Sequence, residues 1–377
     1  MENKGITNLL YISITSQTGG VPRHIEYALK AAAGTEYSIT VAAPSDGEYS
    51  GVFRELSKDY LDLRLKPYSF RSLFVLRKYI RSHGIRIVHS HGKGAGLYSR
   101  PLKLLCPGIK VVHTFHGIYV EKYGWLLKAV YLLGEKILKR LTDAFVCVSQ
   151  SEFENAMELG IAERMRAHVI NNGVDTAVFC PHDIDRKSYR SAWGLEDKTF
   201  VIGCVARFDV DKGHEYLIPA FRLFHNSHPA AKLILVGDGP EKEKMEKLVA
   251  ESGLAEQVVF TGLRQDVPDL LQMFNLFVSA SLKEGMPYTL IEAMASGVPV
   301  VATNVIGNKD VVTDGKTGLL VEPRSSEALR EGMERLYQHR ELMQAIRENG
   351  PEEVKRNYSV DTSERELFRL YDQLLGV

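Results

Sequence analysis

Twelve short apolar runs rich in β-branched residues recur along the chain, with helical segments between them. Such runs are typical of strands buried on both faces of a parallel sheet. Six fall in each half, which predicts an α/β fold of two Rossmann-like, doubly wound parallel-sheet domains facing a central cleft. The expected strands are residues 8–14, 37–43, 85–91, 109–117, 143–149 and 167–174, then 200–207, 231–239, 257–262, 275–281, 297–304 and 317–323.

The length of the chain agrees with two domains, because 377 residues exceed the size at which single cores usually stop growing. A polar stretch without the strand pattern, within residues 173–200, separates the two halves. We therefore predict an N-terminal domain of residues 1–175 and a C-terminal domain of residues 176–360. The remaining residues, 361–377, have the apolar spacing of an amphipathic helix that needs a docking surface.

Charge divides the chain although the formal net charge is zero. Residues 1–170 carry 23 Lys and Arg against 15 Asp and Glu, a balance of +8, and the remainder carries −8. Between Arg64 and Arg140 there are 16 basic residues and only Glu121 and Glu135 to oppose them. The basic surface is therefore expected on the N-terminal half.

Cysteine usage and hydropathy restrict the compartment. The four cysteines are scattered, without a C-x-x-C pair or a histidine at ligand spacing, so neither a zinc site nor a disulfide framework is expected. A reducing cytoplasm fits this pattern. The N-terminus has no signal-peptide architecture, and no apolar run approaches the roughly 20 residues that span a bilayer. Any membrane contact is expected to be peripheral, at the inner face of the cell membrane.

Two glutamates flank an apolar stretch that reads EGMPYTLIEAMASG. The pattern predicts a helix over residues 288–296, with Pro287 at its first position and Gly297 ending it. The amides and the positive dipole end of a helix start suit an anion such as a diphosphate. Glu284 would lie just before this helix and Glu292 inside it.

The position of Glu292 among apolar neighbours needs a reason, because a buried carboxylate is costly without hydrogen-bond donors. Sugar hydroxyls are such donors. A diphosphate over the helix start, with a hydroxylated ring on each side, would occupy Glu284 and Glu292 together. The alternative is that Glu284 is a favourable charge near the helix dipole and Glu292 a surface residue.

Arg207 ends another predicted strand of the same half and Lys212 follows it after a short loop, in CVARFDVDKG. Arg207 and Lys212 could stabilise the charge that develops on a departing diphosphate. The alternative is two exposed loop charges. Asp209 and Asp211 between them match a D-x-D pattern, but the neighbouring cations favour a solvated turn over a metal site, and we expect no metal requirement.

In the N-terminal half, Gly19 and Gly20 follow the first strand and would let a phosphate approach the backbone. A dinucleotide fingerprint is missing, because there is no G-x-G-x-x-G and no ribose-binding acid, so an ordinary turn is the alternative. His116 lies at the exit of a strand and is a candidate for orienting a substrate. The other histidines of these strands are interpreted as structural: His89, His91 and His113.

Aromatic, aliphatic and basic residues interleave in VEKYGWLLKAVYLLGEKILKRL, residues 120–141. The default interpretation is a core helix with one solvated face. With the other basic residues of the same half, an anionic membrane surface or a lipid-diphosphate acceptor is the alternative. Nucleic acid is disfavoured because no recognition motif accompanies the charge.

Several motifs together are similar to those of a known family. E-x7-E at Glu284 and Glu292, with GCVARFDVDKG, LILVGDGPE, FTGLRQDVPDLL and VINNGVD at the expected intervals, resembles the family 4 retaining glycosyltransferases of the GT-B fold. The resemblance covers essentially the whole chain and is more specific in the second half.

The resemblance implies roles for the C-terminal residues. Arg207 and Lys212 would bind the diphosphate of a nucleotide sugar, Glu284 would contact the donor hexose at the reaction centre, and Glu292 would contact the ribose. The backbone of the intervening segment would approach sugar and phosphate, namely Gly285, Met286, Pro287, Tyr288, Thr289 and Leu290.

Further roles are implied outside this segment. Leu263 and Arg264 would lie near the base, Gly20 would touch the phosphates, and His116 would lie by the donor sugar at the reaction centre. The final helix, 361–377, would cross back onto the N-terminal domain. Transfer would retain the anomeric configuration without metal and without a demonstrated protein nucleophile.

One segment departs from the commonest family pattern. Residues 305–312 read VIGNKDVV where many relatives show a Gly-Gly pair and a glutamate. The G-N-x-D variant resembles enzymes that build cell-surface polysaccharides and lipid-linked glycans.

The sequence therefore favours a glycosyltransferase that moves a hexose or N-acetylhexosamine from a nucleotide-diphosphate sugar, with uridine as the expected base, to a lipid-linked or polysaccharide acceptor. Three alternatives stay open: a nucleotide-sugar epimerase of the same fold, a non-catalytic sugar-nucleotide-binding module, and a dinucleotide-dependent oxidoreductase.

Overall fold

The computed structural model describes residues 6–120, 123–182, 184–196 and 198–377. Glu121 and Lys122, which enter the charge count above, lie outside the described residues. The chain forms two compact units, one of Met1–Asn172 with Val360–Val377 and one of Gly173–Ser359. The break thus falls between residues 172 and 173, where the sequence placed it at 175/176.

Unit 1 contains a parallel sheet of seven strands in the order β3-β2-β1-β4-β5-β6-β7. All six strands expected in this half are present. The prediction missed a seventh, β3, because its sequence DYLD is polar and its residues at the sheet edge are exposed or only half-buried. The strands are β1 (Thr7–Ser13), β2 (Tyr37–Ala43), β3 (Asp59–Asp62), β4 (Ile87–His91), β5 (Lys110–Thr114), β6 (Ala144–Cys147) and β7 (Ala167–Val169).

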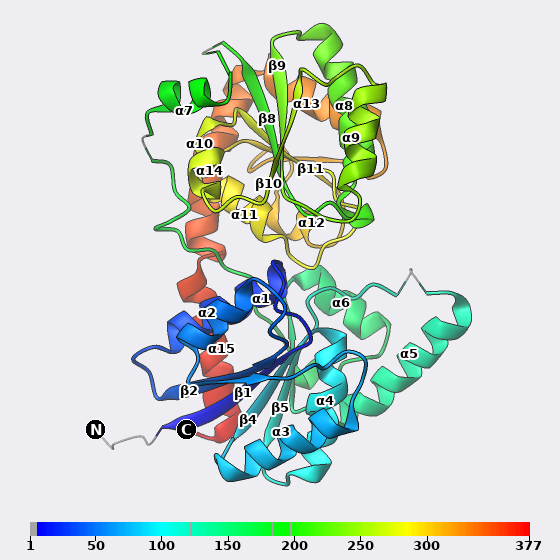
Figure 1. Cartoon of the computed structure of the whole chain (residues 1–377), viewed down its shortest axis with the longest axis vertical. Coiled ribbons are helices and arrows are strands. Elements are labelled where there is room, and N and C mark those ends of the chain that lie inside the picture. The colour runs from blue at the N-terminus through cyan, green and yellow to red at the C-terminus, as the bar shows by residue number, and fades with distance from the viewer. Residues whose placement is uncertain (1–5, 121–122, 183, 197) are drawn as a thin grey trace. The chain divides into compact units, whose positions relative to one another are not determined.

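Helices cover both faces of this sheet (Figure 1). Side chains alternate along β1, so that Leu9 and Tyr11 pack under α1, α2 and α15, while Leu10 and Ile12 pack under α3 and α4. The helices of unit 1 are α1 (Gly20–Ala32), α2 (Tyr49–Leu56), α3 (Phe70–Ser82), α4 (Gly92–Leu105), α5 (Trp125–Leu138), α6 (Gln150–Glu158) and α15 (Val360–Leu375), with short 3-10 turns at Lys139–Leu141 and Arg164–Arg166.

Helix α15 lies along β1 and β2, the first two strands of the chain (Figure 1). Leu367 and Tyr371 are buried in the same core as the first strand. The Tyr371 hydroxyl lies 2.6 Å from the hydroxyl of Tyr11 and 2.6 Å from Nδ1 of His89. Hydrophobic burial and a buried hydrogen-bond network therefore both attach the C-terminal helix to unit 1.

Unit 2 contains a parallel sheet of six strands in the order β10-β9-β8-β11-β12-β13, which confirms the six strands expected in the second half. Its core packs β8 and β9 against α8, α9 and α13. The strands are β8 (Phe200–Val205), β9 (Ala231–Val236), β10 (Val258–Gly262), β11 (Leu276–Ser279), β12 (Val300–Thr303) and β13 (Leu319–Val321). The helices are α7 (Arg186–Ala192), α8 (His214–Ser227), α9 (Lys242–Glu251), α10 (Val267–Met273), α11 (Tyr288–Ala295), α12 (Asn308–Val311), α13 (Ser326–Gln338) and α14 (Arg340–Asn357), with a 3-10 turn at Val210–Lys212.

The strand orders fix where a ligand can bind in each sheet. Strand order reverses between β1 and β4 in unit 1 and between β8 and β11 in unit 2. Ligands of open α/β sheets bind outside the carboxyl ends of the strands at such switch points. Ligands are therefore expected at the loops after β1, β4, β8 and β11.

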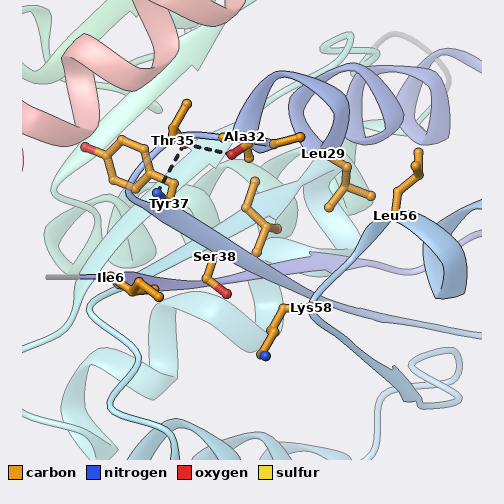
Figure 2. A pocket seen from close by; sticks show the side chains of 11 residues that line it. Ile6, Leu29, Ala32, Thr35, Tyr37, Ser38, Leu56 and Lys58 are labelled. Carbon is orange, nitrogen blue, oxygen red and sulfur yellow. Dashed lines mark hydrogen bonds between the residues drawn. The ribbon is translucent and has the colours of Figure 1, made fainter.

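A surface hollow in unit 1 lies at the opposite end of its sheet. Ile6, Thr35, Tyr37 and Ser38 line it, and these residues precede or begin β1 and β2 (Figure 2). Thr35 closes the turn there, its hydroxyl donating to the carbonyl of Ala32 at 2.8 Å. Because the hollow lies at the amino ends of the strands, it is remote from the switch point.

Among the described residues, no helix combines the length and the apolar character needed to cross a bilayer.

Candidate functional site

The carboxylate of Glu284 is held in place after strand β11. Its Oε1 accepts hydrogen bonds from Nζ of Lys212 at 2.6 Å and from the hydroxyl of Ser281 at 2.7 Å. Only 8% of Glu284 is exposed. Lys212 follows β8, so this ion pair spans the strand-order reversal of unit 2. Both charged residues were predicted to belong to the site, and the structure brings them together.

Close backbone approach makes this pairing possible. Gly213, directly after Lys212, has φ 66°, and a Cβ at this position would lie 2.0 Å from the carbonyl oxygen of Ala280. The amide of Leu282 donates to the carbonyl of Asp211 at 2.7 Å. Only glycine fits here, because it allows both the left-handed conformation and the contact with the neighbouring loop.

Helix α11 follows Glu284 and confirms the predicted helix within one residue at its end. Pro287 is its N-cap rather than its first helical residue, which corrects the sequence assignment by one position. The helix ends at Ala295, and Gly297, directly after the C-cap Ser296, has φ 70° as expected of a glycine stop. Glu292 lies in this helix and is 1% exposed, so its interpretation as a surface residue is wrong.

The donor-binding segment implied by the resemblance is packed into unit 2. Thr289 is partly exposed, and the other members of the segment are buried, namely Gly285, Met286, Pro287, Tyr288 and Leu290. The amides of a helix's first turn have no acceptor inside the helix, so this turn of α11 presents donors beside the buried Glu284 carboxylate.

The G-N-x-D segment supports the Glu284 loop, which sequence reasoning missed. A Cβ at Gly307 would lie 2.7 Å from the carbonyl oxygen of Gly285 and 2.9 Å from Cβ of Glu284. The side-chain amide Nδ2 of Asn308 donates to the carbonyl oxygen of Thr303 at 3.0 Å, at the end of β12. The G-N-x-D sequence, which departs from the commonest family pattern, was the signal that could have indicated the contact between Gly307 and the Glu284 loop.

Arg207 is exposed and pairs with the carboxylate of Asp209. The Asp209 carboxylate is thereby committed to an ion pair within its own loop. Arg207 belongs to the same loop as Lys212, but its guanidinium, with a side chain 53% exposed, is not fixed against Glu284. The structure thus places one of the two predicted cations on the carboxylate and leaves the other at the surface.

Leu263 and Arg264, expected near the base, lie after β10 and are both exposed. Arg264 donates to both carboxylate oxygens of Asp266, at 2.8 and 2.6 Å, and lies over the ring of Trp193. Its hydrogen bonds hold the pKa of Asp266 at about 2. The guanidinium therefore has a local structural role in this loop.

The candidate residues of unit 1 lie beside its switch point. Gly20 is the exposed first residue of α1, after Gly19. His116 follows β5 with φ 57°, a conformation that few non-glycine residues adopt and that often accompanies functional sites. It lies partly exposed, and its Nε2 is 3.1 Å from Nδ1 of His91.

His91 and a further residue, His24, form a cluster with His116. The three ring centroids lie 4.9 to 5.4 Å apart. Burial lowers the pKa of all three imidazoles, that of His24 to about 4. Sequence reasoning interpreted His91 as structural and did not single out His24, because helix α1 brings it to the strand ends only in the fold.

Helix α5 is not the core helix that the default interpretation expected. Of its residues, all of which the structure describes, only Glu135 is buried, and it pairs with Nη1 of the buried Arg100 at 2.7 Å. Six large apolar side chains of α5 are 57–83% exposed: Trp125, Leu126, Leu127, Val130, Leu133 and Ile137. An exposed apolar patch of this kind marks an interaction surface.

The site in unit 2 combines properties that recognise a phosphorylated, hydroxylated ligand. A lysine and a helix start offer charge and donors to phosphate, and a buried carboxylate accepts hydrogen bonds from hydroxyls. All of them lie at the carboxyl ends of β8 and β11, where the strand order reverses.

Two family models match the chain. The model "Glycosyl transferases group 1" matches residues 185–353, and the model "Glycosyltransferase Family 4" matches residues 18–178. Together they account for most of both units.

Named relatives agree with the family models. The chain is 27% identical over 327 residues to EpsD of Bacillus subtilis, a glycosyltransferase by name, covering 84% of this chain and 85% of EpsD. It is 29% identical over 256 residues to UDP-Gal:alpha-D-GlcNAc-diphosphoundecaprenol alpha-1,3-galactosyltransferase of Escherichia coli, covering 67% of this chain and 66% of that enzyme.

A solved structure agrees with the fold. HepE from Anabaena, crystallised with UDP and glucose, has a TM-score of 0.87 at 20% identity, covering 97% of this chain and 100% of HepE. This likeness confirms the GT-B fold. Family models, relatives and fold together identify the chain as a member of the family 4 glycosyltransferases of the GT-B fold and as an enzyme of the hexosyltransferase class.

Proposed function

We propose that this glycosyltransferase moves a hexose or N-acetylhexosamine from a UDP-sugar to a lipid-linked or polysaccharide acceptor, with retention of the anomeric configuration. The acceptor hydroxyl forms the new bond to the anomeric carbon on the face from which the diphosphate leaves. The hydroxyl proton passes to the departing phosphate oxygen. The proposal needs no metal ion, because protein cations and helix amides neutralise the diphosphate.

The observation that carries this proposal is the buried Glu284 carboxylate held by Lys212 and Ser281 at the switch point of unit 2. Glu284 contacts the donor sugar, and Lys212 serves the diphosphate as well as the carboxylate. Glu292, buried in α11, accepts from the ribose. The proposed contacts of Gly20 and His116 with the donor rest on the family resemblance.

The choice of uridine and of the acceptor class is supported by likeness. The Escherichia coli relative is named for a UDP-sugar donor and a diphosphoundecaprenol-linked acceptor, and the HepE crystal contains UDP and glucose. The G-N-x-D segment, which packs on Glu284, is the feature of this chain that resembles enzymes of that type.

A donor-hydrolysis screen tests the donor assignment. Nucleotide sugars of uridine, guanosine and adenosine are incubated with the full-length protein, with and without EDTA, and release of the nucleoside diphosphate is measured. We expect turnover of UDP-sugars with or without chelator. Turnover of GDP-sugars alone would refute the base, and complete loss with EDTA would refute the metal-independent scheme.

Two substitutions test the site. Glu284→Ala and Lys212→Ala should each lower turnover by on the order of 100- to 1000-fold, as removal of a transition-state partner does, while circular dichroism shows a folded protein. Glu334→Ala is the matched control, because the Glu334 carboxylate pairs with the half-buried His228 elsewhere in unit 2. Near-normal turnover in both site variants would remove the assignment.

Product analysis and binding measurements distinguish retention from inversion, and a transferase from the other classes of protein. Proton NMR of the glycoside distinguishes retention from inversion. An epimerase would convert the UDP-sugar without any acceptor, and a non-catalytic module would bind UDP without turnover. Calorimetry with NAD and with UDP distinguishes an oxidoreductase, since only that class binds NAD.

We also propose that the protein lies in the cytoplasm and contacts the anionic inner face of the membrane through α5. The helix exposes its apolar side chains beside Lys136 and Arg140, which are also exposed. An amphipathic helix with this composition binds in the interface through apolar burial and attraction to anionic lipids.

Tryptophan fluorescence tests this contact directly. Trp125 and Trp193 are the two tryptophans of the chain, so Trp193→Phe leaves Trp125 as the sole reporter on α5. Vesicles with anionic phospholipid should shift its emission to the blue, and Leu126→Asp should abolish retention of the protein in a flotation assay. Met165→Asp is the control, because Met165 is 92% exposed in unit 1 outside α5. Equal retention of both variants, or none of the parent at low salt, would refute the contact.

A further inference from the structure

Three histidines cluster in unit 1, although the proposed contact with the donor sugar involves only one of them. His24 comes from helix α1, His91 ends β4 and His116 follows β5, so three separate elements converge at the switch point. One ring nitrogen of each lies within 4.8 Å of those of the other two. The family resemblance assigns a role to His116 alone.

Two of these side chains carry unsatisfied buried atoms. His24 is 4% exposed and His91 is 1% exposed, and Nε2 of each has no hydrogen-bond partner among the described residues. Buried polar atoms almost always have a partner, so the orphaned Nε2 of His24 needs an explanation. A ligand that accepts the lone pair of this nitrogen would supply it.

We propose that His24, His91 and His116 form a transition-metal site of the Zn²⁺ class, whose occupation by the ion inhibits the enzyme. Three imidazoles with an open fourth position make a common tetrahedral zinc arrangement. His116, which follows the carboxyl end of β5, is the partly exposed member of the cluster and offers the ion a route of entry.

The distances fit with a small adjustment. Tetrahedral zinc with bonds of about 2.0–2.1 Å sets its ligand nitrogens roughly 3.4 Å apart. The Nδ1 of His91 and the Nε2 of His116 are already 3.1 Å apart. The third ring must move inward, and His24 is the one on a helix side chain rather than at a strand end.

The surroundings favour neutral imidazoles, which are the form that binds metal. Desolvation lowers the pKa of each ring, and its histidine neighbours lower it further for His91 and His116.

The expected consequence is competition rather than activation. Binding of metal at His116 would withdraw this side chain from the donor sugar, so metal and donor should each weaken the binding of the other by the same factor. This inhibitory step rests on the proposed donor contact of His116, whereas binding of the ion does not.

The binding test needs no activity. Full-length, tag-free protein is treated with chelator, dialysed and titrated with Co²⁺, whose visible absorption is intense in a tetrahedral site, and with Zn²⁺ by calorimetry. We expect one ion per chain. His24→Gln and His91→Gln should weaken binding by more than the roughly 10- to 100-fold that loss of an outer partner costs.

His168→Gln is the control, because His168 is a half-buried histidine of the same unit outside the cluster. His116→Gln, at the partly exposed position, is the variant to use if the two buried substitutions fail to fold. Binding that survives in every cluster variant, or no binding by the parent, would overturn the inference.

Activity then separates the two proposals. Zn²⁺ should inhibit UDP-sugar turnover, EDTA should reverse it, and UDP-sugar should lower the apparent affinity for Co²⁺. If the protein binds one ion per chain but turns over no nucleotide sugar, the metal site stands and the proposed function is refuted. Turnover that is insensitive to Zn²⁺ at saturating occupancy would refute the inhibitory role.

Discussion

The buried ion pair between Arg100 and Glu135 allows a quantitative test of how α5 is attached. Both side chains are shielded from solvent, at 0% and 3% exposure, and Nε and Nη2 of Arg100 have no other partner among the described residues. Glu135→Ala would leave the guanidinium buried and without its counter-ion. Breaking a buried pair from one side costs about 3–5 kcal/mol.

That loss should be visible in solution. For a folding unit of this size, 1 kcal/mol corresponds to roughly 2–4 °C in Tm, so we expect a decrease of roughly 6–20 °C. Urea unfolding followed by circular dichroism gives the free energy, and hydrogen exchange read by mass spectrometry shows whether α5 opens first. Glu26→Ala is the control, since the exposed Lys30–Glu26 pair should contribute less than about 1 kcal/mol.

A double variant makes the reasoning refutable. Arg100→Met with Glu135→Leu removes both charges and fills a similar volume, so it should recover most of the stability lost in Glu135→Ala. If the single change costs under about 1 kcal/mol, or the double variant is no more stable than the single one, the desolvated guanidinium is not what determines the cost.

Three further outcomes are expected. Gly307→Ala should lower turnover at least tenfold, since its Cβ would collide with the Glu284 loop, while Gly315→Ala, with a similar φ and open space, should retain turnover in the same UDP-release assay. Burial raises the pKa of Glu364 to about 8, so between pH 4.5 and 8 the folded protein holds a proton that the unfolded chain has lost. The free energy of unfolding should therefore fall by up to roughly 1.4 kcal/mol per pH unit as pH rises through this range. Glu364→Gln should remove this pH dependence from urea midpoints measured across the range. Thiol titration of the native protein should detect one fast group, Cys180, which is partly exposed, because the other three cysteines are buried; a fast signal that persists in Cys180→Ser would contradict this.

The sheets were predictable because their central strands are buried on both faces and read as continuous apolar runs. Strand β3 was not, because an exposed edge strand carries polar residues that resemble a loop. The one-residue difference at Pro287 reflects a residue that suits both the N-cap and the first turn, so composition alone cannot separate the two positions.

Pairing between distant residues was predictable only in part. Lys212 and Glu284 were each expected after a predicted strand of the same half, but their pairing, the hydrogen bond from Ser281 and the contact of Gly307 depend on loop conformations that spacing does not encode. The burial of His24 beside His116 depends on the rotation of α1 over the sheet. Likewise, the composition of α5 was compatible with a core helix, and only its packing shows the apolar side chains exposed.

The placement of α15 also constrains how the protein is made. Helix α15 contributes Leu367 and Tyr371 to the core that begins with β1, so the core around this strand is incomplete until α15 is synthesised. Domains generally fold as units during translation. Unit 2, which is continuous in sequence, can finish folding before α15 is made, whereas unit 1 cannot be complete until α15 has left the ribosome. A nascent chain stalled before residue 360 would therefore carry an N-terminal sheet with part of one apolar face uncovered, the kind of species that chaperones bind.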